Sequence, residues 1–182
     1  LKIYRWSTGS YLECQDFWRI SGIERDVFLY SQPKAALKDF RVTSTLDDTY
    51  KDGIFKLGVD LRNNGSTAGN MTLVYELLDA NGKVVATGEK ATNVAAGETR
   101  TVSFDQTLPD VKTWSSEAPN LYKLVMTVKE NGKVNEIIPF NVGFRRIEIK
   151  PTEQLARNGK PYVCLFINGQ PLKLKGVNIH EH

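Results

Sequence analysis

The only two histidines of this sequence, His180 and His182, stand in its last seven residues, GVNIHEH. Alternate side chains of an extended strand point to the same face, so both imidazoles would share one face and Glu181 would point away. A zinc site takes three or four protein ligands, and the spacing differs from the H-E-x-x-H helix of metalloproteases. The residues therefore favour the end of a strand, with its functional surroundings beyond residue 182, over a self-contained metal site.

The two cysteines, Cys14 and Cys164, lie far apart in the sequence. Two cysteines cannot form a disulfide scaffold, and we expect two free thiols rather than one long-range bridge.

Charge and hydropathy exclude two classes of partner. The net charge is +3, and the 24 Lys and Arg residues are interspersed with 21 Asp and Glu residues, so we expect no nucleic-acid surface. No apolar run approaches the ~18 residues of a membrane span, so we expect no membrane partner. The sequence opens with LKIYRWSTG and not with a charged and apolar leader. We expect it to be cut from a longer protein at both ends, and the compartment, bacterial cytoplasm or periplasm, stays open.

Alternation of apolar and polar residues dominates the middle of the chain. One face holds Phe55, Leu57, Val59 and Leu61, a second run holds Met71, Leu73, Tyr75 and Leu77, and a third holds Tyr122, Leu124, Met126 and Val128. A period of two predicts strands with one wet face. The expected strands are Leu37–Leu46, Phe55–Asn63, Met71–Asp79, Val84–Glu89, Arg100–Leu108, Tyr122–Glu130 and Val134–Asn141.

Asn-Gly pairs at residues 64–65, 81–82, 131–132 and 168–169 predict tight hairpins, because both residue types tolerate positive φ. About seven strands at this spacing are typical of a two-sheet sandwich. The predicted fold class is all-β, an immunoglobulin-like β-sandwich over residues 33–148 without a disulfide, with extended flanking segments from neighbouring domains.

The flanking segments belong to other domains in this interpretation. Residues 1–32 hold a loop and one short apolar strand, DVFLY, which needs a partner sheet. Residues 149–182 hold a predicted hairpin, YVCLFINGQPLKLKGVN, that turns at Asn168-Gly169.

Four stretches carry a resemblance to a known family, in the same order as in that family. They are SYLECQDFWRISGIERDVFLY, WSSEAPNLY, VGFRRIEI and NGQPLKLKGVNIHEH. Together they resemble family two of the glycoside hydrolases: the end of its jelly-roll sugar-binding domain (1–32), its sandwich, and the start of its (β/α)8 catalytic barrel (149–182). QDFWRISGIERDV and the HEH ending look more like the β-galactosidase branch than like the β-glucuronidases.

The resemblance implies retaining hydrolysis of terminal β-D-galactosides, in which one glutamate is the nucleophile and another the acid and base. In the family both glutamates follow residue 182 of this sequence, so we expect no catalytic residue in this chain and no activity from it. The sandwich is then a structural spacer, and the full enzyme binds a carbohydrate substrate as a homo-oligomer. The alternatives are a β-glucuronidase-type member of the family, or a free-standing carbohydrate-binding or adhesive β-sandwich, which would need aromatic side chains exposed on one face.

Two positions match functional residues of the family. His180 matches a histidine that binds the galactosyl group, where an imidazole donates a hydrogen bond without a fixed charge. Asp16 matches an aspartate that binds a monovalent cation, and a carboxylate suits a hard cation. The resemblance implies Na+ and Mg2+ as possible ions of the full-length enzyme and no cofactor in this fragment. For Trp6 and Trp18 we expect burial against the jelly roll, and for Trp114 in WSSEAPNLY a structural corner.

Overall fold

The computed structural model describes residues 2–12, 22–23 and 25–178. Its contacts divide the chain into two compact units, Leu1–Ser31 with Leu174–His182, and Gln32–Lys173. The assignment of residues 1–32, 33–148 and 149–182 to three domains of a longer enzyme stays a prediction.

Among its described residues, the first unit contains one short helix, α1 (Gly9–Leu12), in which Tyr11 N and Leu12 N donate to Thr8 O. The prediction of a strand over DVFLY is wrong, because no described strand pairs with residues 26–30. Its apolar side chains are exposed, with Leu29 at 103% and Phe28 at 75%. No helix of the described residues has the length and apolarity needed to cross a membrane.

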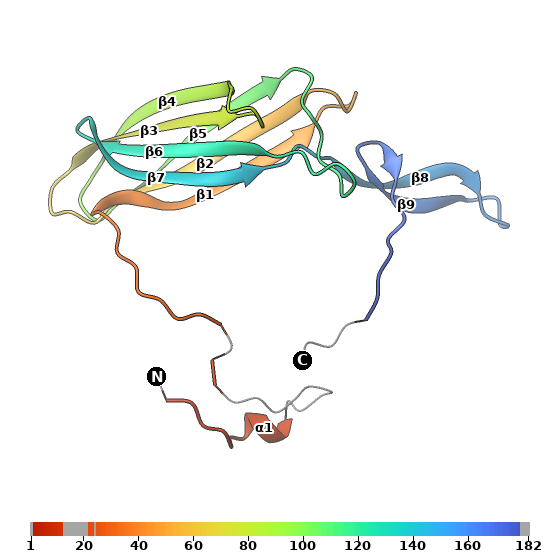
Figure 1. Cartoon of the computed structure of the whole chain (residues 1–182), viewed down its shortest axis with the longest axis horizontal. Helices are drawn as coiled ribbons and strands as arrows, with labels where there is room; N and C mark the ends of the chain where they lie inside the picture. The colour runs from red at the N-terminus through yellow and green to blue at the C-terminus, as the bar shows by residue number, and fades with distance from the viewer. Residues whose placement is uncertain (1, 13–21, 24, 179–182) are drawn as a thin grey trace. The chain divides into compact units, whose positions relative to one another are not determined.

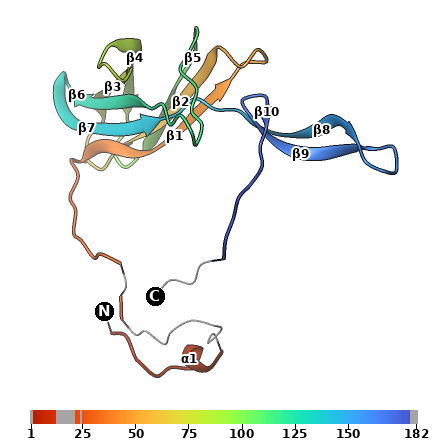
Figure 2. The same ribbon diagram turned by 45° about the vertical axis from the view of Figure 1, so that its right-hand side comes forward.

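The second unit contains a two-layer β-sandwich (Figures 1 and 2). One sheet has the order β1-β2-β5 and the other β4-β3-β6-β7, and all pairs are antiparallel. The bounds are β1 (Ala35–Leu46), β2 (Gly53–Asn63), β3 (Gly69–Leu78), β4 (Val84–Val94), β5 (Thr99–Leu108), β6 (Tyr122–Glu130) and β7 (Lys133–Val142). The predicted all-β sandwich is confirmed.

The interior is filled by the side chains that the period-two alternation of the sequence predicts to face inward. The inner positions of β2, β3 and β6 are all at most 7% exposed, from Phe55 and Met71 to Tyr122 and Val128. Tyr75 lies at the centre, with its ring centroid 5.5 Å from that of Phe55 and 4.8 Å from that of Phe104. The large aromatic side chains of these strands therefore serve the core and not an exposed binding face.

Three of the four predicted Asn-Gly turns are hairpins. Asn131 (φ 48°) with Gly132 (φ 83°) and Asn168 (φ 48°) with Gly169 (φ 78°) take the left-handed conformation of two-residue turns, and the Asn81-Gly82 loop joins β3 to β4. The prediction of a hairpin at Asn64-Gly65 is wrong, because β2 and β3 lie in different sheets. The buried Asn63 side chain accepts from Gly65 N and donates to Thr67 O and Val94 O, which shapes this segment into a crossover.

A third sheet, of order β10-β9-β8, follows the two sheets of the sandwich (Figure 2). It consists of β8 (Ile147–Leu155), β9 (Pro161–Ile167) and β10 (Gln170–Pro171). The predicted hairpin at Asn168-Gly169 is present, but its second arm, β10, has two residues. The main partner of β9 is β8, a strand that the sequence analysis did not assign.

The hydroxyl of Tyr75 generates a prediction about the core. Its Oη has no hydrogen-bond partner among the described residues, and burial raises the pKa of Tyr75. Replacing a buried unpaired hydroxyl by hydrogen removes a desolvation penalty, so Tyr75→Phe should leave the free energy of unfolding unchanged or raise it by about 1–2 kcal/mol.

The matched control is Tyr122→Phe, because Tyr122 Oη accepts from Lys112 N at 2.9 Å. That variant should lose about 1 kcal/mol in denaturant unfolding. A comparable loss for Tyr75→Phe would contradict the prediction.

Candidate functional site

Most of the predicted site residues lie outside the described residues. They are His180, Glu181, His182, Asp16, Cys14 and Trp18. Trp6 is described and is 61% exposed, with the guanidinium of Arg5 5.7 Å from its ring centroid. The roles predicted for His180 and Asp16 therefore stay predictions.

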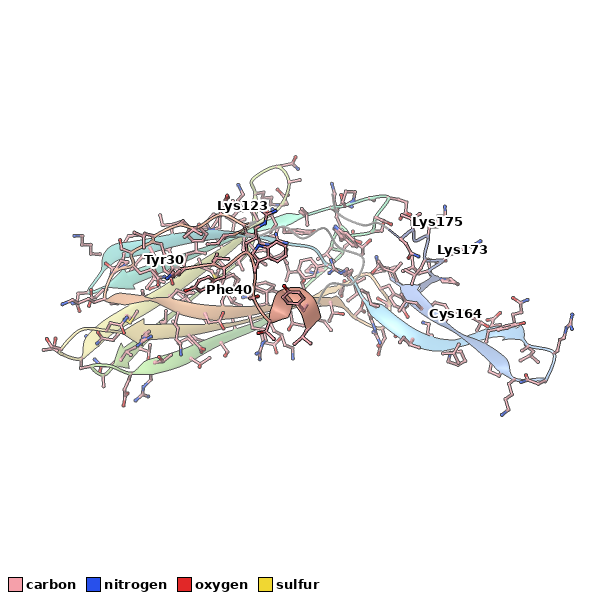
Figure 3. The ribbon with its side chains drawn as sticks, turned by 90° about the horizontal axis from the view of Figure 1, so that it is seen from below. Tyr30, Phe40, Lys123, Cys164, Lys173 and Lys175 are labelled. Atoms are coloured by element: carbon pink, nitrogen blue, oxygen red, sulfur yellow. The ribbon has the colours of Figure 1, made fainter. Side chains whose placement is uncertain are left out.

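Cys164 lies on β9 (Figure 3) as a free, half-buried thiol, as predicted. Among the described residues, no three His, Cys, Asp or Glu side chains gather closely enough to hold a metal ion.

The structure does bring together a polar group that the sequence analysis did not single out. We define the joint cluster as Tyr50 and Asp48 from the β1–β2 loop with Arg146, Glu148 and Lys150 from the start of β8. Tyr50 Oη donates to Glu148 Oε2 at 2.7 Å and accepts from Lys150 Nζ at 2.8 Å. Arg146 bonds Asp48 Oδ1 at 2.6 Å and Glu148 Oε1 at 3.2 Å. The cluster thus links the sandwich to the third sheet, that of β8, β9 and β10.

The charges in the joint cluster stabilise each other. The hydroxyl of Tyr50 is the largest cause that lowers the pKa of Glu148; partial burial opposes it, and Arg146 and Lys150 reinforce it. The same hydroxyl raises the pKa of Lys150, and the Asp48 carboxylate raises the pKa of Arg146. A carboxylate such as that of Glu148, with a lowered pKa and several hydrogen-bond donors around it, is poorly suited to donate or take a proton. We therefore interpret the joint cluster as structural.

The Asn168-Gly169 turn lies at the same junction. Asn168 Oδ1 accepts from Arg146 N at 3.0 Å, and Asn168 Nδ2 donates to Trp114 O at 3.0 Å. A Cβ on Gly169 would lie 2.8 Å from the Tyr50 ring, and its φ of +78° also favours glycine. This turn therefore has two reasons for its glycine, one conformational and one steric.

The WSSEAPNLY stretch forms the corner that receives this turn. Trp114 N donates to Phe144 O at 2.8 Å, and the guanidinium of Arg145 lies 4.6 Å from the Trp114 ring centroid. Asn120 Nδ2 donates to Thr113 O, and the Ser115 hydroxyl accepts from Ala118 N. The expectation of a structural corner agrees with these contacts, and Glu117 accepts a hydrogen bond from the Ser116 hydroxyl.

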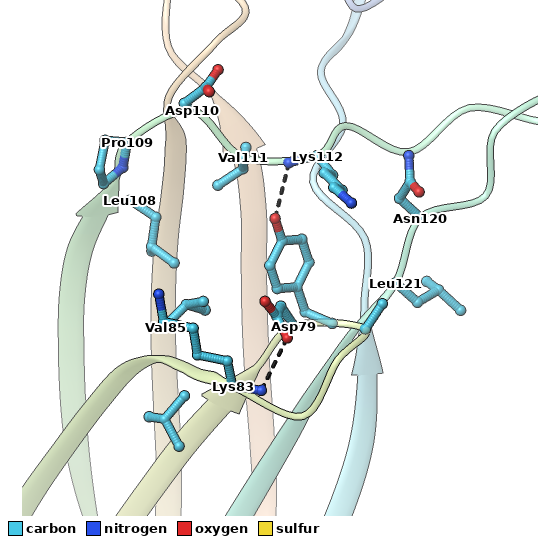
Figure 4. A pocket seen from close by; sticks show the side chains of 13 residues that line it. Asp79, Lys83, Val85, Leu108, Pro109, Asp110, Val111, Lys112, Asn120 and Leu121 are labelled. Carbon is cyan, nitrogen blue, oxygen red and sulfur yellow. Dashed lines mark hydrogen bonds between the residues drawn. The ribbon is translucent and has the colours of Figure 1, made fainter.

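A depression of about 430 Å³ lies where the β3–β4 loop meets the segments after β5 and before β6 (Figure 4). Two of its polar side chains bond within the protein: Asp79 Oδ1 accepts from Asn81 N and Lys83 N, and Tyr122 Oη accepts from Lys112 N. Three charged side chains, those of Lys83, Asp110 and Lys112, also line the depression. The remaining lining is mostly aliphatic, including Val84, Val85 and Leu121. The depression lies where these turns meet, and none of the predicted site residues lines it.

One sequence signal for the joint cluster was available. Arg146, Glu148 and Lys150 alternate with Ile147 and Ile149 in VGFRRIEIK, so a strand would place all three charges on one face. The partner residue Tyr50 carries no such signal, because its position depends on a loop conformation with φ 59°.

Comparison with known proteins gives two matches to family models. The model of glycosyl hydrolases family 2 matches residues 35–145, and that of the family's sugar binding domain matches residues 1–33. The chain is 41% identical to a β-galactosidase of Priestia megaterium, over 100% of this chain and 17% of that protein. It is 40% identical to a β-galactosidase of Halalkalibacterium halodurans, over 100% of this chain and 16% of that protein. The chain thus spans about a sixth of the length of these relatives.

Solved structures show the same fold at lower identity. A Bacteroides uniformis β-glucuronidase superposes with a TM-score of 0.76 at 20% identity, covering 90% of this chain and 19% of that one. A putative β-galactosidase of Bacteroides fragilis gives a TM-score of 0.61 at 23% identity, covering 73% of this chain and 18% of that one. The family-model match covers more than half of the 182 residues, and the predicted resemblance is confirmed: the chain belongs to glycosyl hydrolases family 2.

Proposed function

We propose that this chain is part of a retaining β-galactosidase, an enzyme that hydrolyses terminal β-D-galactosides. The observation that carries the proposal is the 41% identity over the whole chain to a protein named β-galactosidase. The likeness to β-glucuronidase structures lies at 18–24% identity and supports the fold alone.

Within that enzyme the sandwich is a spacer that holds the sugar-binding and catalytic parts in a fixed arrangement. A spacer needs a rigid core and fixed ends rather than reactive side chains. The buried interior of β2, β3 and β6 supplies the first requirement. The joint cluster and the Asn168 turn, which tie β8 and β9 to the sandwich, supply the second.

The chemistry of the reaction needs two carboxyl groups about 5 Å apart on either side of the glycosidic bond. The family resemblance assigns both glutamates to sequence beyond residue 182. In the complete enzyme we propose that His180 donates a hydrogen bond to a hydroxyl of the galactosyl group. We also propose Asp16 as a ligand of a monovalent cation such as Na+, whose other ligands come from other segments, with Mg2+ as a second possible ion. The complete enzyme is proposed to be a homo-oligomer.

The reaction class is tested with chromogenic substrates. The pure 182-residue chain should give no turnover of a β-galactoside, because it lacks both glutamates. The complete enzyme should hydrolyse the β-galactoside and prefer it over the matching β-glucuronide. Turnover by the 182-residue chain would contradict the spacer assignment, and a preference for the glucuronide would replace galactosidase by glucuronidase.

The role of His180 is tested in the complete enzyme. His180→Phe removes the donor and should lower kcat/KM for a galactoside by about tenfold or more, since a sugar hydroxyl loses its buried partner. Thermal unfolding serves as the control and should change little. An unchanged kcat/KM would remove His180 from the substrate site.

The contribution of the joint cluster to the stability of the folded state is tested by varying the pH. The lowered pKa of Glu148 means that the folded state holds its proton less tightly than the unfolded state, so this contribution to stability is present above the ordinary value of 4.5 and is lost as the pH falls through the folded pKa. Glu148→Gln should be less stable than wild type at pH 7, and the difference should shrink below about pH 4.

The matched control is Asp105→Asn, which breaks the Lys56–Asp105 pair, whose side chains are 57% and 64% exposed. Exposed pairs contribute little, so this variant should match wild type at both pH values. Equal stability losses of the two variants in thermal unfolding would show that the joint cluster contributes no more to stability than an exposed ion pair.

A further inference from the structure

Gly58 lies in the middle of β2, where the fold itself does not require a glycine. It pairs in regular antiparallel register with Arg41 of β1 and Ser103 of β5, and no bulge falls at this position. It is not among the residues with positive φ. Among the described residues, a Cβ on Gly58 would meet only Ser103 Oγ, at 3.9 Å. A side chain would therefore fit, although a glycine in a strand interior weakens the strand.

Two other strand glycines of the sandwich have a steric reason. A Cβ on Gly53 would lie 2.8 Å from the ring of Phe144, and one on Gly88 would lie 2.6 Å from the ring of Tyr75. Packing therefore requires glycine at both positions. Gly58 instead leaves open space above the outer face of its sheet. A glycine in a strand interior often marks a place where a ligand or another backbone approaches closely.

The space above Gly58 belongs to a groove of about 440 Å³ on the outer face of the β1-β2-β5 sheet, which we call the Gly58 groove. Lys56 and Asp60, two residues before and after Gly58, point to the same face and line it. Lys56 pairs with Asp105 at 3.2 Å, and Asp60 Oδ1 accepts from Thr101 Oγ1 at 2.6 Å. Four residues of strand span about 13 Å, and three strands span about 10 Å. These dimensions suit a ligand of one or two pyranose rings.

The lining of the Gly58 groove is polar, and its formal charges balance. It contains two cations, Arg41 and Lys56, two anions, Asp39 and Asp60, and hydroxyl side chains such as that of Ser103. Asp39 and Arg41 are exposed residues of β1. Carboxylates accept hydrogen bonds and a guanidinium donates them, so the lining suits a ligand whose groups do both, as hydroxyls do.

We propose that the Gly58 groove binds a neutral saccharide, with a sugar ring lying directly over the backbone of Gly58. The hydroxyls of the sugar donate to the carboxylates of Asp39 and Asp60 and accept from the guanidinium of Arg41. This inference goes beyond the proposed function, because it concerns binding by the sandwich itself.

Two other occupants fit the Gly58 groove less well. The buried centres of protein–protein interfaces are depleted in Lys, Asp and Ser, which are the residue types found here, so a second copy or another protein is disfavoured. A charged small molecule of either sign would meet a like charge, either Asp39 and Asp60 or Arg41 and Lys56. A neutral ligand with many hydroxyls avoids both costs.

Titration of the isotope-labelled 182-residue chain with lactose, followed by NMR, tests the proposal. The choice of lactose rests on the proposed function, so cellobiose serves as a second neutral disaccharide that does not. With at least one of them the amide signals of Arg41, Gly58 and Ser103 should shift and saturate in the millimolar range. Glucuronate, the matched anion, should bind at least tenfold more weakly.

Three outcomes of this titration would overturn the proposal: no saturable shift with either disaccharide up to about 100 mM, shifts only outside the groove, or tighter binding of glucuronate. The readout contains no hydrolysis, so failure of the proposed activity is distinguishable from failure of this site.

A variant that fills the space adds an independent readout. Threonine favours strands and restricts the unfolded chain, so Gly58→Thr should raise the Tm by about 2 °C, while the affinity for the disaccharide should fall at least tenfold. The matched control is Arg62→Thr, on the same face of β2 but outside the groove, which should leave the affinity unchanged. A lower Tm for Gly58→Thr would show that the fold needs this glycine, and an unchanged affinity would show that no ligand lies over it. Either result contradicts the proposal.

Discussion

The sandwich depends on one apolar interior shared by its two sheets. Side chains from β2, β3 and β6 alternate into it with almost no exposed surface, and Tyr75 joins the two layers through contacts with Phe55 and Phe104. Such close packing holds the sandwich together by apolar burial, at about 25 cal/mol for each Å² removed from water. The loops at both ends of the sheets can then carry polar groups in fixed positions.

Those fixed loops explain how a domain without a reactive centre among its described residues contributes to an enzyme. Tyr50 is held in the β1–β2 loop, where Asp47 accepts hydrogen bonds from the Thr49 hydroxyl and from Lys51 N and Asp52 N. These bonds, led by that of Thr49, lower the pKa of Asp47 to about 2. The loop in turn presents Tyr50 to Glu148 and Lys150. A short chain of hydrogen bonds thus connects the sandwich to the third sheet.

Much of the fold could be predicted from the sequence, because period-two alternation and Asn-Gly turns are local signals. The interior positions of β2, β3 and β6 follow directly from them. The errors arose where a local signal meets a non-local requirement. DVFLY has strand-forming residues but no described partner strand, and Asn64-Gly65 has turn chemistry but lies in a crossover set by Asn63.

The candidate site was harder to predict for the same reason. The charges of β8 were visible as an alternation, but their meaning depends on Tyr50, which lies almost a hundred positions earlier and is brought close only by the folded sandwich. The family resemblance supplied what local patterns lack, namely roles for His180 and Asp16 that no contact among the described residues indicates.

The ties of β1 to β7 bear on how the protein is made. Leu37 N donates to the Glu136 carboxylate, and Asn135 donates to Ala35 O, across separations of 99 and 100 residues. On the ribosome, β1 emerges long before these partners, and non-local contacts form only after the intervening chain has been ordered. β1 can pair with its neighbour β2 as soon as both have been made, but its ties to β7 must wait for the last strand. Translation of the whole segment therefore precedes closure of the sandwich, and until then the inner face of the early strands stays uncovered.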